Sequence, residues 1–175
     1  MGGFFLSRAD AERGSSGARE AFARAGFPPP RRCPLGSWEL LLYAKQLGGG
    51  GFSAGEPATG MTFVVGTLVY RGLPPAESAV ALHRDCERGD VCWERLLGTY
   101  CVLRWSAGQL SLLTDPRALL GVYADEDGRF VTSSFLAGVG AKAGRARLNQ
   151  ETCIAVIATG CLFGKETEVR GLRRL

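Results

Sequence analysis

The sequence predicts an α+β domain in which helices cover β-sheets. Its 175 residues match the length of one domain, so we expect a single domain over residues 1–175. With 46% hydrophobic and 22% charged residues, the composition is that of a globular protein. Short segments with strand character alternate with amphipathic helical segments, an order typical of sheets covered by helices.

The first half of the chain is expected to supply three strands and two helices. The strands are predicted at residues 3–6, 38–43 and 61–70, and the helices at residues 8–25 and 75–88. Gly26 and the prolines that follow it end the first helix. Four consecutive glycines at 48–51 predict a loop that extends to about Gly60. The near-continuous apolar run at 61–70 predicts a strand buried on both faces.

The second half is expected to begin with a short helix, capped by Asp90 and ending at Leu97. Four antiparallel strands then form a predicted meander, at residues 100–105, 109–114, 119–124 and 129–132. Two further helices are predicted near 135–141, capped by Ser133 or Ser134, and at 150–158, capped by Asn149.

The charge pattern does not favour a nucleic-acid partner. The net charge is only +4, from 21 basic and 17 acidic residues. The late basic residues lack the interleaved aromatic residues of single-strand binders, so a solvated face is favoured over a phosphate-binding patch. These residues are Lys142, Arg145, Arg147, Arg170, Arg173 and Arg174.

The sequence also predicts a cytoplasmic chain. No apolar run approaches the ~20 residues that span a bilayer, and no secretory signal pattern is present, so we expect no membrane partner. The six cysteines, none in C-x-x-C spacing, are expected to be reduced thiols.

Few residues offer catalytic chemistry. The chain has one histidine, His83. Together with Cys86 and Cys92 it could bind a metal only poorly, because a second pair of ligands is lacking, so we expect no metal and no cofactor. The acidic residues at 125–127 are typical of a hairpin turn rather than a metal site. Asp115 stands at a predicted strand end before Pro116. It is expected to cap a turn, with a binding role as the alternative.

Several short motifs occur in the order found in one family. They are Met1-Gly2-Gly3, Leu96-Leu97-Gly98-Thr99-Tyr100, Asp115 followed eight residues later by Tyr123, Ser133-Ser134, and the terminal segment 167–175. In this order the chain resembles the N-terminal glutaminase domain of asparagine synthetases, which are class II glutamine amidotransferases of the N-terminal nucleophile (Ntn) hydrolase superfamily. The resemblance implies a four-layer α/β/β/α sandwich of two antiparallel sheets. We expect strand 61–70 and the strands within 100–132 to form the two sheets, with residues 3–6 beside the former active-site cleft.

The chain departs from the family at the residues that perform the chemistry. Active members expose a cysteine where this chain has Gly2, which has no side chain to attack a substrate. They bind glutamine with Asn-Gly-Glu where this chain has Val65, Gly66 and Thr67, and a valine side chain donates no hydrogen bond. The resemblance therefore implies no catalytic residue. It leaves Asp115, Tyr123 and Ser133 as candidates for structural or binding roles.

β-Lactam synthetases and lasso-peptide cyclases look like asparagine synthetases whose N-terminal domain has lost glutaminase activity. By that resemblance, we expect a catalytically inactive domain that supports an ATP-dependent amide-forming ligase in peptide or natural-product maturation. The implied partners are an ATP-dependent synthetase domain or subunit and a peptide substrate. The chain is expected to be either a piece of such a ligase or a subunit, with an apolar docking surface near residues 160–175.

Two alternatives remain. One is a stand-alone binding module of the same fold that holds a partner protein or precursor peptide. The other is a hydrolase whose nucleophile, such as Ser7, is exposed by deeper processing of the N-terminus.

Overall fold

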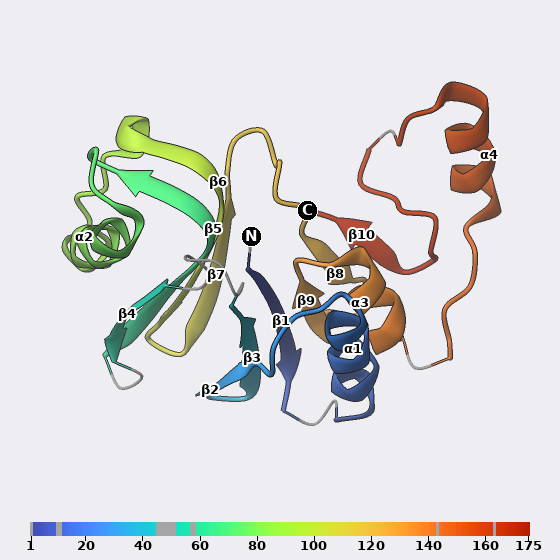
Figure 1. Cartoon of the computed structure of the whole chain (residues 1–175), viewed down its shortest axis with the longest axis horizontal. Helices are drawn as coiled ribbons and strands as arrows, with labels where there is room; N and C mark the ends of the chain where they lie inside the picture. The colour runs from blue at the N-terminus through green and yellow to red at the C-terminus, as the bar shows by residue number, and fades with distance from the viewer. Residues whose placement is uncertain (1, 10–11, 45–51, 57–58, 143, 163) are drawn as a thin grey trace.

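The computed structural model has a mixed α+β fold with two antiparallel sheets (Figure 1). It describes residues 2–9, 12–44, 52–56, 59–142, 144–162 and 164–175. The six-stranded sheet has the order β10-β8-β9-β1-β3-β2, and the four-stranded sheet has the order β4-β5-β6-β7.

The elements of the six-stranded sheet are β1 (Gly3–Arg8), β2 (Arg31–Leu35), β3 (Trp38–Tyr43), β8 (Tyr123–Asp125), β9 (Phe130–Thr132) and β10 (Leu172–Arg174). The four-stranded sheet contains β4 (Phe52–Glu56), β5 (Gly60–Tyr70), β6 (Leu96–Ser106) and β7 (Gln109–Thr114). The helices within the described residues are α1 (Glu12–Arg24), α2 (Pro75–Arg88), α3 (Phe135–Ala141) and α4 (Gln150–Thr159), with a 3-10 turn η1 (Trp93–Arg95).

Alternating side chains along the strands divide the interior into layers. In β1, Phe4 and Leu6 join the apolar cluster that lies between the two sheets, whereas Phe5 faces the opposite side. In β5, Val65 faces the cluster between the sheets and Val64 faces away from it. The two sheets therefore pack face to face through a shared core.

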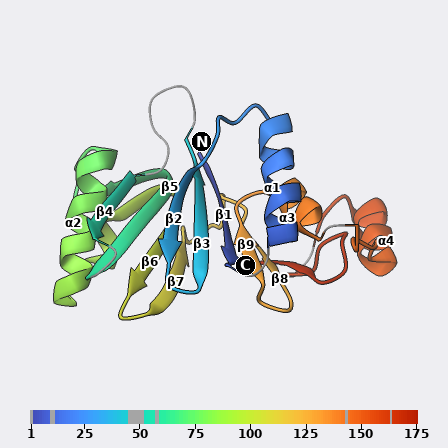
Figure 2. The ribbon, with the colours of Figure 1, turned by 90° about the horizontal axis from the view of Figure 1, so that it is seen from below.

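The helices cover the outer faces of the sheets (Figure 2). The apolar faces of α1 and α3 pack on the six-stranded sheet, and α2 packs on the four-stranded sheet. The helices α1 and α3 approach closely, because a Cβ atom at Gly17 would overlap the carbonyl oxygen of Gly140. None of these helices is both long enough and apolar enough to cross a membrane, and the same holds for every helix of the described residues.

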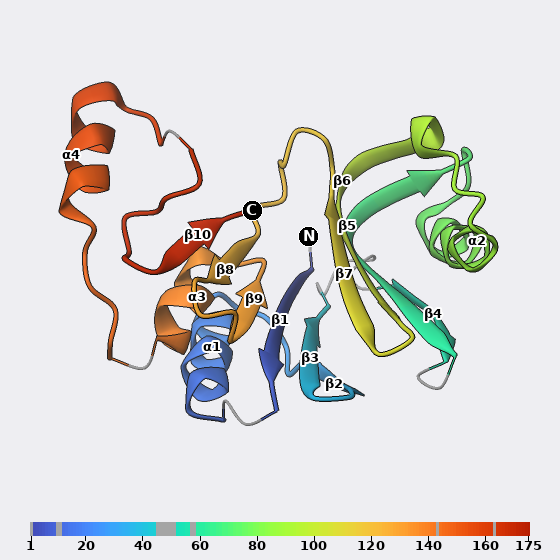
Figure 3. The ribbon, with the colours of Figure 1, turned by 180° about the vertical axis from the view of Figure 1, so that it is seen from behind.

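The helix α4 has a different environment, because none of its residues is buried. It lies at the far end of the molecule from α2, as Figures 1 and 3 show. Isolated bridges hold its flanking segments to the segment before β10 and to β10 itself, Leu148 to Val169 and Glu166 to Arg173.

The predicted meander is wrong. The strands β6 and β7 form a hairpin in the four-stranded sheet, while β8 and β9 form a hairpin in the six-stranded sheet. The chain leaves the first sheet after β7 because Asp115 closes a turn there, with Ala118 donating its amide to the Asp115 carbonyl at 2.8 Å. The expected division of strands is wrong for the same reason, since β5, β6 and β7 share one sheet and β1 pairs with β3 and β9 in the other.

Other boundaries also differ from the expectations. Residues 31–35 and 52–56 form the edge strands β2 and β4, and the second of these lies inside the predicted loop, whose glycines at 48–51 fall outside the described residues. The short helix predicted from Asp90 to Leu97 is only η1, and Leu96 already begins β6. Ser134 caps α3 by accepting a hydrogen bond from Ala137, whereas Asn149 precedes α4 without a capping hydrogen bond from its side chain.

Candidate functional site

The N-terminal end of β1 is packed into the protein. Gly2 is buried, and a Cβ atom at Gly3 would lie 2.7 Å from the Phe22 ring. The Phe4 amide donates a hydrogen bond to Ser133 Oγ at 2.8 Å, and the Ser133 amide donates to the Phe4 carbonyl at 3.1 Å. The position expected for a lost nucleophile, Gly2, therefore has no reactive side chain, and the residue after it is tightly packed.

The positions expected for a glutamine clamp differ in exposure and in role. Val65 is fully buried among the residues between the sheets, while Thr67 is exposed. Gly66 has φ +98°, and a Cβ atom there would overlap the Thr99 carbonyl oxygen of the neighbouring strand. A glycine is therefore needed here for the close approach of β5 and β6, independently of the family resemblance.

The nearest thiol to this region cannot replace the missing cysteine. Cys101 pairs with Val65 across β5 and β6 and is fully buried. Burial raises the pKa of its thiol to about 12, and the charge of Asp115 adds to the effect. Cys101 is thus protonated near neutral pH and is a poor nucleophile.

The carboxylate of Asp115 accepts hydrogen bonds from the backbone of the turn that follows it. It is buried and accepts hydrogen bonds from the amides of Arg117, Leu119 and Leu120, at 3.1, 3.2 and 3.4 Å. The geometry is that of a turn cap, which holds the chain as it passes from one sheet to the other.

The other two candidate residues contact structural partners. Ser133 joins β1 to the start of α3 through its hydrogen bonds with Phe4. The Tyr123 ring lies edge-on to Phe135, with ring centroids 5.6 Å apart. Tyr123 and Ser133 lie close together, because Tyr123 pairs with Thr132, the residue before Ser133. The hydrogen bonds of the Asp115 carboxylate lie instead in the turn after β7.

Two buried carboxylates form ion-pair networks that sequence reasoning missed. Asp125 pairs with Arg129 at 2.7 Å and with the buried Lys142 at 2.9 Å, and these contacts tie β8 to the end of α3. Burial alone would raise the pKa of Asp125, but hydrogen bonds from Arg129 and Lys142 outweigh it and lower the pKa. The second network, in which Asp85 accepts from the Tyr70 hydroxyl at 2.7 Å, ties α2 to β5.

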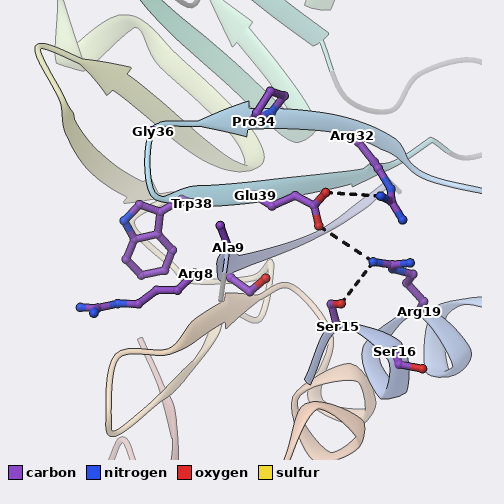
Figure 4. Close-up of a pocket in the computed structure, with 11 residues that line it drawn as sticks. Arg8, Ala9, Ser15, Ser16, Arg19, Arg32, Pro34, Gly36, Trp38 and Glu39 are labelled. Atoms are coloured by element: carbon purple, nitrogen blue, oxygen red, sulfur yellow. Dashed lines mark hydrogen bonds and ion pairs between the residues drawn. The ribbon is translucent and has the colours of Figure 1, made fainter. Parts of the chain in front are cut away.

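A cavity of about 460 Å³ lies where the end of β1 meets α1, β2 and β3 (Figure 4). Three of the residues that line it are arginines, Arg8, Arg19 and Arg32, and one is a carboxylate, Glu39. The Arg8 guanidinium stacks over the Trp38 ring at 5.6 Å from its centroid. Its lining therefore carries a net positive charge.

The arginines of this cavity retain hydrogen-bonding capacity. Glu39 lies 3.9 Å from Arg19 and 3.7 Å from Arg32, which are ion-pair distances too long for hydrogen bonds. The Nε atom of Arg19 is buried, and no partner for it occurs among the described residues. Guanidinium groups with unused donors bind carboxylates and phosphates, so this cavity is suited to holding an anionic group.

No sequence motif marked this cavity, because its residues come from β1, α1, β2 and β3. The charged residues Arg8, Arg19, Arg32 and Glu39 are each ordinary surface types when taken alone. A signal would have been the opposite charges of Arg32 and Glu39, which form an ion pair because β2 lies beside β3. Using it requires the strand β2, which the sequence analysis missed.

Ser7 also lines the cavity, and its position bears on the hydrolase alternative. Cleavage before Ser7 would remove Gly3 to Leu6, although β1 pairs with β3 on one side and β9 on the other. Such processing would remove most of a central strand, so the structure offers no support for Ser7 as an exposed nucleophile.

Comparison of the chain with protein-family models gives no match, and comparison with curated proteins gives no significant match.

Proposed function

We propose that this chain is a glutaminase-like domain that has lost glutaminase activity and supports an ATP-dependent amide-forming ligase of the asparagine synthetase-like type. The observation that carries the proposal is the combined loss at β1 and β5. Gly2 has no nucleophile, and Val65 fills the core where a clamp residue is expected.

The arrangement of the layers supports the same assignment. Two antiparallel sheets share a core, α1 and α3 cover one outer face, and α2 covers the other. This is the order of the four-layer α/β/β/α sandwich of Ntn hydrolases. We therefore propose that the chain has the fold of that superfamily.

The proposed ligase half docks on α4 and the segments beside it. Leu148, Ile154 and Ile157 are 68%, 66% and 85% exposed, and Leu162 and Leu175 are also exposed. An apolar helix with no buried residue gains little from folding against its own chain, so a partner surface supplies the missing burial. Of these exposed residues, Leu162 and Leu175 lie within residues 160–175, where the sequence analysis expects a docking surface, and the others precede that segment.

The experiment is site-specific photo-crosslinking in the native host. A photo-reactive amino acid at Ile157 is expected to capture a protein or domain that carries the Ser-Gly-Gly-x-Asp-Ser pyrophosphate loop of ATP-dependent synthetases. The matched control is the same amino acid at Val80, an exposed apolar position on α2. Equal capture of that partner from both positions, or capture only of proteins without an ATP site, would overturn the ligase assignment.

The second candidate function is a stand-alone binding module that holds a partner protein or precursor peptide. The arginine-lined cavity favours it, because this cavity is suited to binding and lies apart from any catalytic constellation in the described residues. In the crosslinking experiment, this function predicts capture of a partner that lacks an ATP site.

A further inference from the structure

The strand β7 is an edge strand of its sheet. Some of its backbone N–H and C=O groups have no hydrogen-bond partner among the described residues. A two-residue turn with positive φ at Ala107 and Gly108 connects it to β6, and Ser106 pairs with Gln109. In such a hairpin alternate residues turn their backbone groups toward the neighbouring strand. The Asp115 amide, bonded to the Tyr100 carbonyl at 3.0 Å, fixes the same alternation at the other end. The residues whose N–H and C=O groups point away from β6 are therefore Leu110, Leu112 and Thr114.

This edge lacks the protection that another edge of the molecule has. At β2 the outward-facing positions are Arg32 and Pro34, which supply a charge and a residue without an N–H group. At the β10 edge, the Arg174 amide is already bonded to the Lys165 carbonyl at 2.7 Å. The β7 sequence, QLSLLT, contains neither charge nor proline. Its edge is chemically open to another strand.

An apolar groove of about 290 Å³ adjoins β7 on the outer face of the sheet. Its floor is formed by β6 and β7, including Val102 and Leu113. The lining also contains Arg104, whose charge is paired with Glu87 at 2.7 Å. Its wall is formed by the end of α2 and the segment after it, where the Trp93 side chain is 57% exposed. An added strand points every second side chain to this face, beside Ser111 and Leu113. The groove can therefore take the side chains of such a strand.

We propose that β7 is a strand-addition site for an extended, uncharged peptide with large apolar side chains at alternate positions. The backbone of the peptide bonds to Leu110, Leu112 and Thr114, and its apolar side chains enter the groove beside Trp93. A peptide is a better occupant than a second copy of this chain. A second β7 would direct Gln109, Ser111 and Leu113 to that face, and only the leucine is large and apolar. The proposal goes beyond the ligase assignment and does not depend on it.

The first test is selection from a display library of random octapeptides. Selection uses the full chain, with counter-selection against Leu112→Pro. Leu112→Pro removes an outward-facing N–H that has no partner, so the variant is expected to keep its fold. Ser111→Pro instead removes a hydrogen bond between β6 and β7, so it is expected to lower the melting temperature. Enriched peptides should alternate apolar residues and bind Leu112→Pro at least about tenfold more weakly, by fluorescence anisotropy. Failure to enrich any peptide that discriminates the two proteins would overturn the proposal.

The second test needs only the wild-type chain. Single N-methylation along the selected peptide should weaken binding at every second residue, because only alternate amides of an added strand face β7. Binding should also slow hydrogen exchange at Leu110, Leu112 and Thr114. A uniform or absent effect of N-methylation would contradict strand addition. If sedimentation shows a dimer and these three amides are protected without peptide, the peptide proposal is wrong. The occupant of the β7 edge is then a second copy of this chain. Neither result bears on glutaminase activity, so failure here is distinct from failure of the proposed function.

Discussion

The space between the two sheets and the surface of α4 place apolar side chains in opposite environments. Between the sheets, Phe4, Val65 and Cys101 are fully buried, and Val65 is a position at which the resemblance expects a substrate clamp. On α4, Ile154 and Ile157 are exposed. Under the proposed function, core side chains occupy the place of a lost reaction centre, and the exposed side chains of α4 meet a partner.

Substitutions in the core and on α4 should differ most in their effect on the free energy of unfolding. The largest loss is expected in the core. Phe4→Ala should lower the free energy of unfolding by about 3–5 kcal/mol, because it removes a buried ring and leaves a cavity. Urea denaturation at constant temperature measures the change. A loss below about 1 kcal/mol would mean that the space between the sheets is loosely packed and able to admit a ligand.

A smaller effect is expected at the ion-pair network beside the C-terminal segment. Asp125→Asn should cost about 3 kcal/mol at pH 7, because Lys142 remains buried without its carboxylate. The folded-state pKa of Asp125 is lowered, so its contribution is present above the unfolded pKa of about 3.9 and is lost as pH falls through the lower folded value.

Urea denaturation of wild type and Asp125→Asn over a series of pH values checks this dependence. The stability difference should be constant above about pH 5 and shrink in more acidic solution. A difference that grows on acidification would contradict the assigned direction of the pKa shift.

The smallest effect on stability is expected on α4. Ile157→Ser should change the free energy of unfolding by less than about 0.5 kcal/mol, because the side chain is exposed. The same variant should weaken capture of the partner. A destabilisation as large as that of Phe4→Ala would show that α4 packs against its own chain, and the contrast between the two regions would disappear.

The sequence was sufficient for the elements whose patterns are local. The apolar run of β5, the amphipathic helix α2 and the turn between β6 and β7 all lie close to the predicted places. Each depends on hydrophobic periodicity or turn residues within one short segment.

The errors arose where the structure depends on distant partners. The strand β2 contains two arginines and a proline, which are tolerated only because it is an edge strand paired with β3. The separation of the β6–β7 and β8–β9 hairpins depends on the turn capped by Asp115, and a strand pattern does not say which sheet a hairpin joins. The arginine-lined cavity was missed because four segments contribute to it.

The candidate site was predictable only as a set of positions. Gly2, Val65 and Thr67 could be identified by resemblance, but the sequence could not say that Val65 is buried while Thr67 is exposed. The two residues are two apart in β5, so their side chains point to the same face, and their different exposure depends on how far the packing between the sheets extends along the strand.

The central claim is that the groups expected for glutamine hydrolysis are lacking beyond the nucleophile alone, and Gly2→Cys tests it most directly. Ammonia and glutamate release from glutamine is measured for this variant and for wild type, after intact mass confirms that Met1 has been removed. We expect no turnover above background in either protein. A new thiol still lacks an oxyanion donor and a substrate clamp, and one such donor alone contributes about 2.7–4 kcal/mol to the transition state. Hydrolysis by Gly2→Cys at about one turnover per second or faster would contradict the account, because it would require a substrate clamp and an oxyanion donor that Val65 does not supply.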